Sequence, residues 1–154
     1  MNKIEELENK LKELSDEIEK LKAEKENEPW KPKYGEWYWY VDNDGCRYEF
    51  IWNDCLESEK RYAIGNVFRT QEEAEFRAEQ LKVEAELRRF SRPFVVGKEN
   101  WEINYDVEYN EVTVFRYYTF QCCNIHFASE DIAQKAIETV GKERIKKYYF
   151  GVEE

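Results

Sequence analysis

The chain has 154 residues, enough for one compact domain with an appendage but too few for two domains of ordinary size. Aromatic residues make up 16% of the sequence and charged residues 38%, and this aromatic content excludes a wholly disordered acidic chain. The net charge of −10 repels a phosphate backbone, so we expect no direct binding to duplex nucleic acid.

The sequence carries no apolar run close to the roughly 20 residues that cross a bilayer, and it does not open on a signal-peptide pattern. We therefore expect a cytoplasmic protein without a membrane partner. The cysteines are too sparse for a disulfide scaffold, and reduced thiols are the simpler interpretation. They are Cys46, Cys55, Cys122 and Cys123.

Residues 1–28 contain no aromatic side chain, and their apolar residues recur at alternating intervals of three and four. This heptad pattern is typical of a coiled-coil seam. The flanking charges fit a parallel pair, since Lys3 could reach Glu8, and Glu17 could reach Lys22, on a neighbouring helix. We expect a homodimer or higher oligomer, and the alternative is a helix packed on the chain's own domain. The seam comprises Ile4, Leu7, Leu11, Leu14, Ile18 and Leu21.

Prolines at positions 29 and 32 predict a linker over residues 29–36, followed by a domain over residues 37–154. Within the domain, residues 67–74 align with residues 126–133 at an offset of 59, and residues 37–39 align with residues 101–103. The alignment predicts two repeats, over residues 37–90 and 97–150.

In the first repeat, we predict strands over residues 37–41 and 46–53, joined by a turn whose Gly45 can take a positive φ. A polar loop over residues 54–60 and a third strand over residues 62–68 would follow. Thr70 then caps a helix, with Glu73 completing a capping box. The helix residues that we expect to be buried are Ala74, Ala78, Leu81 and Ala85.

In the second repeat, we predict strands over residues 101–107, 111–120 and 122–127, then a helix capped by Ser129 that ends near Gly141. Its inward residues would be Ile132, Ala133, Ala136, Ile137 and Val140. The expected fold class is α+β: two βββα repeats share one antiparallel sheet with helices on one face, and a coiled-coil helix precedes them.

Residues that could carry chemistry are few. His126 is the single histidine, no catalytic spacing ties it to a nucleophile, and no phosphate-binding glycine loop is present. Cys122 and Cys123 are adjacent, so on a strand their thiols would point to opposite faces and would not converge on zinc. Residues 42–45 lack the later ligands of a calcium loop. We therefore expect no enzymatic activity, no cofactor and no metal.

Aromatic residues line both sides of the first predicted strand and alternate on the second. They fill a small core, form a subunit interface, or form a stacking platform on which rings bind base-like ligands and cations bind phosphate. Nearby cations are Arg47, Lys60, Arg61, Arg69 and Arg116, with Arg47, Arg69 and Arg116 preferred. The candidate ligand-binding residues are Trp37, Trp39, Arg47, Tyr48, Trp52, Arg69 and Arg116.

Residues 30–38, WKPKYGEWY, and residues 65–75, GNVFRTQEEAE, resemble a family of small phage and prophage accessory proteins. That family combines a W-x-P-x-x-G-E-x-Y-Y entry, a G-N-x-F-x-T-x-E-E-A-E helix start and often a coiled-coil front. Accessory phage proteins of this size often antagonise bacterial immunity, so the resemblance implies a counter-defence role in the host cytoplasm. It carries over no site residues.

Two mechanisms without catalysis follow from these features. In the first, an oligomer sequesters a nucleotide-derived immune signalling molecule, which the aromatic residues and arginines favour. In the second, an acidic inhibitor docks on a nucleic-acid-handling defence effector, as anti-CRISPR proteins do, which the net charge of −10 favours.

Overall fold

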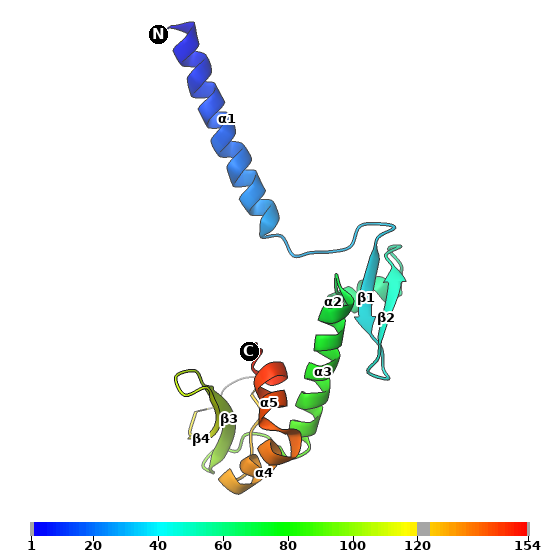
Figure 1. Ribbon diagram of the computed structural model, residues 1–154, viewed down its shortest axis with the longest axis vertical. Coiled ribbons are helices and arrows are strands. Elements are labelled where there is room, and N and C mark those ends of the chain that lie inside the picture. The colour runs from blue at the N-terminus through cyan, green and yellow to red at the C-terminus, as the bar shows by residue number, and fades with distance from the viewer. Residues whose placement is uncertain (1, 120–123, 154) are drawn as a thin grey trace. The chain divides into compact units, whose positions relative to one another are not determined.

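The computed structural model describes residues 2–119 and 124–153, and the chain divides into two compact units, Met1–Lys33 and Tyr34–Glu154. The first unit contains helix α1 (Lys3–Glu26; Figure 1), and this helix begins with a capping box. Asn2 Oδ1 accepts the N–H of Ile4, and the Glu5 carboxylate accepts the N–H of Asn2. No residue of α1 is buried within this chain. The predicted helix is therefore confirmed, and its pairing with a second copy stays a prediction.

The second unit begins with an antiparallel hairpin, β1 (Trp37–Val41) and β2 (Arg47–Ile51). Strand β1 has the predicted bounds, and Gly45 has the positive φ, 75°, that the turn requires. Tyr38 lies opposite Phe50 and Tyr40 lies opposite Tyr48, so these rings share one face of the hairpin.

The loop over residues 54–60 and the third strand over residues 62–68 are wrong. Helix α2 (Leu56–Ala63) covers most of the loop and the start of the strand, and a turn follows it. Asp54 turns the chain with a φ of 54°, and α2 has acidic residues in its first turn and basic residues in its last, which complement its dipole. Only Phe68 keeps a strand-like contact, exchanging two hydrogen bonds of 2.9 Å with Trp39.

Helix α3 (Gln71–Arg88) begins as predicted, with Thr70 Oγ1 accepting the N–H of Glu73 at 3.2 Å. The Glu73 carboxylate accepts the N–H of Arg69. The predicted buried stripe is right at Ala74 and Ala78 and wrong at Leu81 and Ala85, which are exposed. The buried face shifts along the helix because its two ends pack into different cores.

Residues after α3 form a second antiparallel hairpin, β3 (Asn100–Asp106) and β4 (Glu111–Tyr117), followed by helix α4 (Glu130–Val140). A short helix, α5 (Lys142–Arg144), leads into a π-helix, η1 (Ile145–Tyr149). Ser129 caps α4 and Gly141 ends it, as predicted. The inward residues of α4 are confirmed except for Ile132, which is exposed.

The single shared sheet that we predicted is wrong, because β1–β2 and β3–β4 are separate two-stranded sheets. The expectation of helices on one face is also wrong for β1–β2, because Trp39 and Val41 pack toward α3 and Tyr38 bonds to Ser58 of α2. The predicted strand over residues 122–127 begins outside the described residues, and Phe127 forms an isolated bridge with Trp101.

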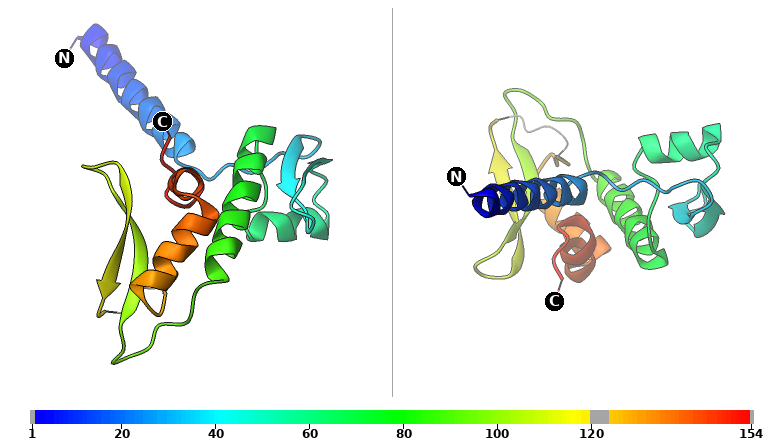
Figure 2. Two further views of the ribbon diagram at one scale, coloured as in Figure 1. Left: turned by 60° about the horizontal axis from the view of Figure 1, so that its bottom comes forward. Right: turned by 90° about the horizontal axis from the view of Figure 1, so that it is seen from above.

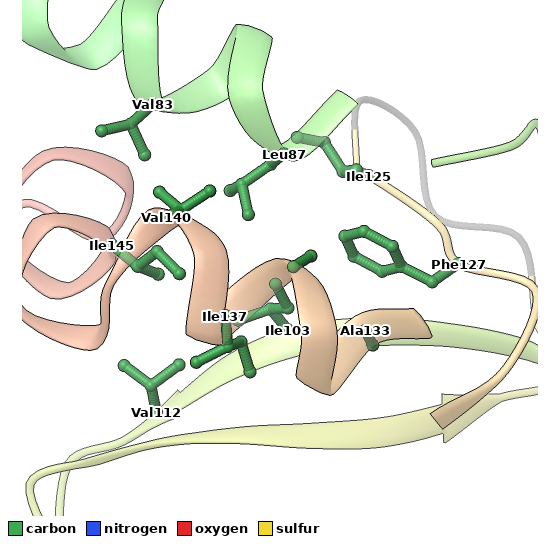
Figure 3. Packing of buried hydrophobic residues seen from close by; sticks show 11 residues of the cluster. Val83, Leu87, Ile103, Val112, Ile125, Phe127, Ala133, Ile137, Val140 and Ile145 are labelled. Atoms are coloured by element: carbon green, nitrogen blue, oxygen red, sulfur yellow. The ribbon is translucent and has the colours of Figure 1, made fainter. Parts of the chain in front are cut away.

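The larger core lies where α4 packs between α3 and the β3–β4 sheet (Figure 3). Val83 and Leu87 enter it from α3, Ile103 and Val112 enter it from the sheet, and the Phe127 ring is fully buried. A smaller core joins Val41 to Ala74 and Ala78 at the other end of α3. Helix α3 therefore connects the first hairpin to α4 (Figure 2).

Among the described residues, no helix is both long and apolar enough to cross a membrane.

Candidate ligand-binding surfaces

The candidate residues that we selected from the sequence do not converge on one site. Strand alternation places Trp37, Trp39 and Arg47 on the face of the first hairpin that carries Val41, and Tyr48 on the opposite face. Arg69 immediately precedes the cap of α3, and Arg116 lies on β4 in the other sheet.

Trp52 belongs to the interior, since its side chain is 1% exposed. Its indole N–H donates to Asp54 at 2.6 Å, and its ring packs edge-on against Tyr38 and Tyr62. This packing leaves no ring face for a ligand. Trp37, by contrast, is 58% exposed.

Two of the preferred arginines have acidic partners. Arg47 of β2 lies 3.6 Å from the carboxylate of Glu75, which belongs to α3. Arg116 donates a hydrogen bond to Glu99, which raises the pKa of its guanidinium, and it lies 5.0 Å from the Tyr118 ring centroid. An anionic ligand would have to compete with a carboxylate at either position.

A different arginine, Arg61 of α2, lies against the opposite face of the first hairpin. The Arg61 guanidinium carbon lies 3.7 Å from the Tyr40 ring centroid and 5.5 Å from that of Phe50. Tyr40 and Tyr48 are neighbours, with ring centroids 6.0 Å apart. We call Tyr40, Tyr48, Phe50 and Arg61 the Arg61 surface.

Buried polar groups hold Arg61 in place. Its Nη1 donates to the Tyr38 hydroxyl at 3.0 Å, and that hydroxyl is hydrogen-bonded to Ser58 Oγ at 2.9 Å. Ser58 is fully buried and also accepts from the Cys55 thiol at 3.3 Å. A guanidinium fixed in this way loses little further side-chain entropy when it binds an anion.

The Tyr48 ring is also fixed at one end, because its hydroxyl donates to Asp44 at 2.8 Å. The backbone N–H of Cys46 and then the Tyr48 hydroxyl hold the pKa of Asp44 below its usual value, and the bond to Asp44 raises the pKa of Tyr48. The Tyr48 side chain is 43% exposed, so its ring is both oriented and accessible.

Sequence reasoning named Arg61 among the nearby cations but did not prefer it, since residues 54–60 were expected to form a loop. The signal that identifies Arg61 is the spacing of three between Ser58 and Arg61, which puts both side chains on one face of an acidic-to-basic helix. Recognition of α2 would therefore have separated Arg61 from the other arginines.

A groove of about 600 Å³ lies elsewhere, beside α3, and includes Phe76, Arg77 and Lys147 in its lining. Glu72, Glu73 and Glu153 line the same groove, so carboxylates outnumber cations there. This balance disfavours a phosphate-bearing ligand.

His126 is buried against Glu102, with Nε2 and Oε1 2.9 Å apart. Asn124 donates to the other Glu102 oxygen at 3.0 Å, and the Phe94 ring packs edge-on against the imidazole. Because His126 is only 5% exposed, this pair has no open approach for a substrate.

The described residues include no group of three or more histidine, cysteine, aspartate and glutamate side chains that could hold a metal ion. Cys122 and Cys123, considered above as zinc ligands, lie outside the described residues. The structure therefore does not test a site that includes them.

The chain matches no protein-family model, and comparisons with curated proteins and with solved structures find no significant match.

Proposed function

We propose that the protein is a non-enzymatic, oligomeric binding protein of the phage counter-defence type, and that it sequesters a nucleotide-derived immune signalling molecule. The observation that carries this proposal is the Arg61 surface, where a fixed guanidinium stacks on the half-buried Tyr40 ring beside the exposed rings of Phe50 and Tyr48. These are the groups that bind a phosphate and a base-like ring. The resemblance of residues 65–75 to phage accessory proteins supports the biological setting.

The oligomeric part of the proposal is supported by α1, whose Ile4, Leu7, Leu11, Leu14, Ile18 and Leu21 are each between 51% and 73% exposed. An isolated polar helix is marginal in water, and pairing would bury this whole seam. In a parallel pair of α1 helices, Lys3 would face Glu8 of the partner helix, and Glu17 would face Lys22.

We also propose that residues 37–90 and 97–150 arose by duplication. Phe68 and Phe127, which are 59 residues apart, each form an isolated bridge to a tryptophan of a hairpin strand. Each phenylalanine is followed two residues later by a helix-capping hydroxyl, Thr70 or Ser129. The two halves thus share a hairpin, a bridge and a capped helix.

A thermal-shift screen of the full chain against cyclic dinucleotides and ADP-ribose derivatives tests the sequestering function. A ligand that binds the folded state raises the melting temperature in proportion to the logarithm of its excess over Kd. We expect a dose-dependent rise with at least one of these ligands and no turnover of it. The absence of any shift across the screen, confirmed by calorimetry, would exclude this function.

The second candidate is an acidic inhibitor that docks on the nucleic-acid channel of a defence effector. The net charge of −10 favours it, and tyrosine, phenylalanine and arginine are enriched in protein interfaces. This candidate predicts that the protein inhibits DNA binding by a purified RNA-guided nuclease, with inhibition weakening as salt rises. Inhibition that does not weaken as salt rises, or the absence of inhibition, would count against this second candidate.

A further inference from the structure

We propose that the Arg61 surface is itself the ligand site, with the phosphate of a nucleotide-like ligand on Arg61 and its ring on Tyr48. This inference rests on the proposed sequestering function and deepens it, because it assigns that function to one face of the first hairpin. It also replaces Arg47, Arg69 and Arg116, the arginines preferred from sequence, with Arg61.

The first step concerns the geometry of Arg61. Stacking on Tyr40 at 3.7 Å fixes the plane of the guanidinium, and the bond to Tyr38 fixes its rotation in that plane. A guanidinium has five N–H donors, and a fork of two parallel donors matches the spacing of phosphate oxygens. The Tyr38 side chain is fully buried, so the hydroxyl that accepts from Arg61 is held in place by the surrounding interior.

The second step concerns the ring. Tyr48 lies directly beside Tyr40 and is held at its hydroxyl end by Asp44, which leaves its ring partly open to solvent. Phe50 extends the same face and is 39% exposed. A ligand ring could stack on Tyr48 while its phosphate reaches the adjacent Arg61. The ligand class is therefore a small nucleotide-like molecule with an aromatic base and one or two phosphates.

The third step is the charge around this face. Asp44 bonds Tyr48, and Glu57 and Glu59 lie in the first turn of α2. These carboxylates oppose a long polyanion more than a ligand with one or two phosphates. The surface thus favours a small molecule over a nucleic-acid strand.

Isothermal titration of the full chain with ADP-ribose and with cyclic di-AMP tests the site. We expect Arg61→Ala to weaken binding of the responsive probe by about ten- to a hundredfold, the effect of a lost charged hydrogen bond. Arg61→Lys should also weaken it, because an ammonium cannot form the planar fork. Arg89→Ala is the matched control, since it removes the same charge from an exposed residue at the end of α3, outside the Arg61 surface, and we expect its Kd to equal that of the wild type.

The melting temperature of every variant is measured without ligand, and Tyr48→Ala supplies an independent arm if Arg61→Ala does not fold. Loss of the stacking ring should weaken binding by about tenfold or more. If Arg61→Ala and Tyr48→Ala bind the probe as tightly as the wild type, the site lies elsewhere and the sequestering function stands. If the wild type binds neither probe, both the function and the site are overturned.

Discussion

Phe127 is the aromatic residue whose loss should cost most in the second half of the domain. Its ring is fully buried in the larger core, and its backbone exchanges two hydrogen bonds with Trp101. We expect Phe127→Ala to lower the free energy of unfolding by about 3–5 kcal/mol, since the truncation leaves a cavity. Urea denaturation measures this change. Phe115→Ala is the control, because Phe115 is 51% exposed, and equal losses in the two variants would contradict the packing described above.

Glu86 and Arg144 form a two-point contact, with Arg144 donating to both carboxylate oxygens at 2.9 Å and 3.0 Å. These hydrogen bonds hold the pKa of Glu86 below its usual value in the folded state. A carboxyl with a lowered folded pKa stabilises the fold above its unfolded pKa, and that stability is lost as the pH falls through the folded pKa.

We therefore expect Glu86→Gln to flatten the loss of stability between about pH 5 and pH 3 relative to the wild type. Thermal melts across this range provide the measurement. Glu138→Gln, an exposed change on α4, serves as the comparison and should follow the wild-type curve. Parallel curves for Glu86→Gln and the wild type would show that the contact contributes nothing.

At the scale of elements, the helix caps carry separable contributions. Thr70 and Ser129 each accept a backbone N–H at the start of α3 and α4. We expect Thr70→Ala and Ser129→Ala each to cost about 1 kcal/mol of stability. Thr139→Ala is the control, because Thr139 lies within α4 and its hydroxyl donates to the Lys135 carbonyl. Chemical denaturation that ranks Thr139→Ala with the caps would refute the capping role.

Elements with local signals were predictable, and those that depend on distant contacts were not. The first hairpin follows from its alternating aromatics and from Gly45, and both major helices of the domain follow from their capping residues. Helix α2 was missed because its short polar sequence has no apolar periodicity of its own. It is held largely by contacts of Ser58 and Arg61 with Tyr38, which lies 20 residues or more away in the chain.

The buried stripe of α3 failed for a related reason. Ala74 and Ala78 contact the first hairpin, whereas Val83 and Leu87 contact α4, and a pattern read along one face cannot reveal two partners. The candidate site could not be predicted for the same reason. Which arginine lies against the hairpin rings depends on the face of the hairpin that α2 covers.

At the scale of the whole molecule, we expect the seam of α1 to determine assembly. We expect the full chain to associate at tens of micromolar and Leu14→Lys to run as a monomer, because a charge at a seam position opposes pairing. Asp16→Lys is the matched control, since Asp16 lies outside the seam, and it should associate like the wild type. Static light scattering gives the masses. A monomeric wild type would exclude the coiled coil.

The shared sheet could not be excluded from the sequence, because strand pairing between hairpins is a long-range choice. Both hairpins carry bridging tryptophans, and the sequence does not specify whether the hairpins join each other or pack on a helix. In the structure, each sheet stays two-stranded and packs on helices. The β3–β4 sheet packs on α4, and the β1–β2 sheet meets α3 on one face and α2 on the other. Small hairpins are marginal alone, and helix packing supplies the missing burial.

The position of α3 in both cores has an energetic consequence for the domain. Fraying of α3 would strip Ala74 and Ala78 from the smaller core and Val83 and Leu87 from the larger one. We therefore expect the hairpins to share one cooperative unfolding event, although no strand among the described residues joins them. Differential scanning calorimetry of the domain transition should give equal calorimetric and van't Hoff enthalpies. Ala78→Gly weakens the backbone in the half of α3 that faces the first hairpin. We expect it to lower the hydrogen-exchange protection of amides in β3 and β4 as much as that of amides in β1 and β2.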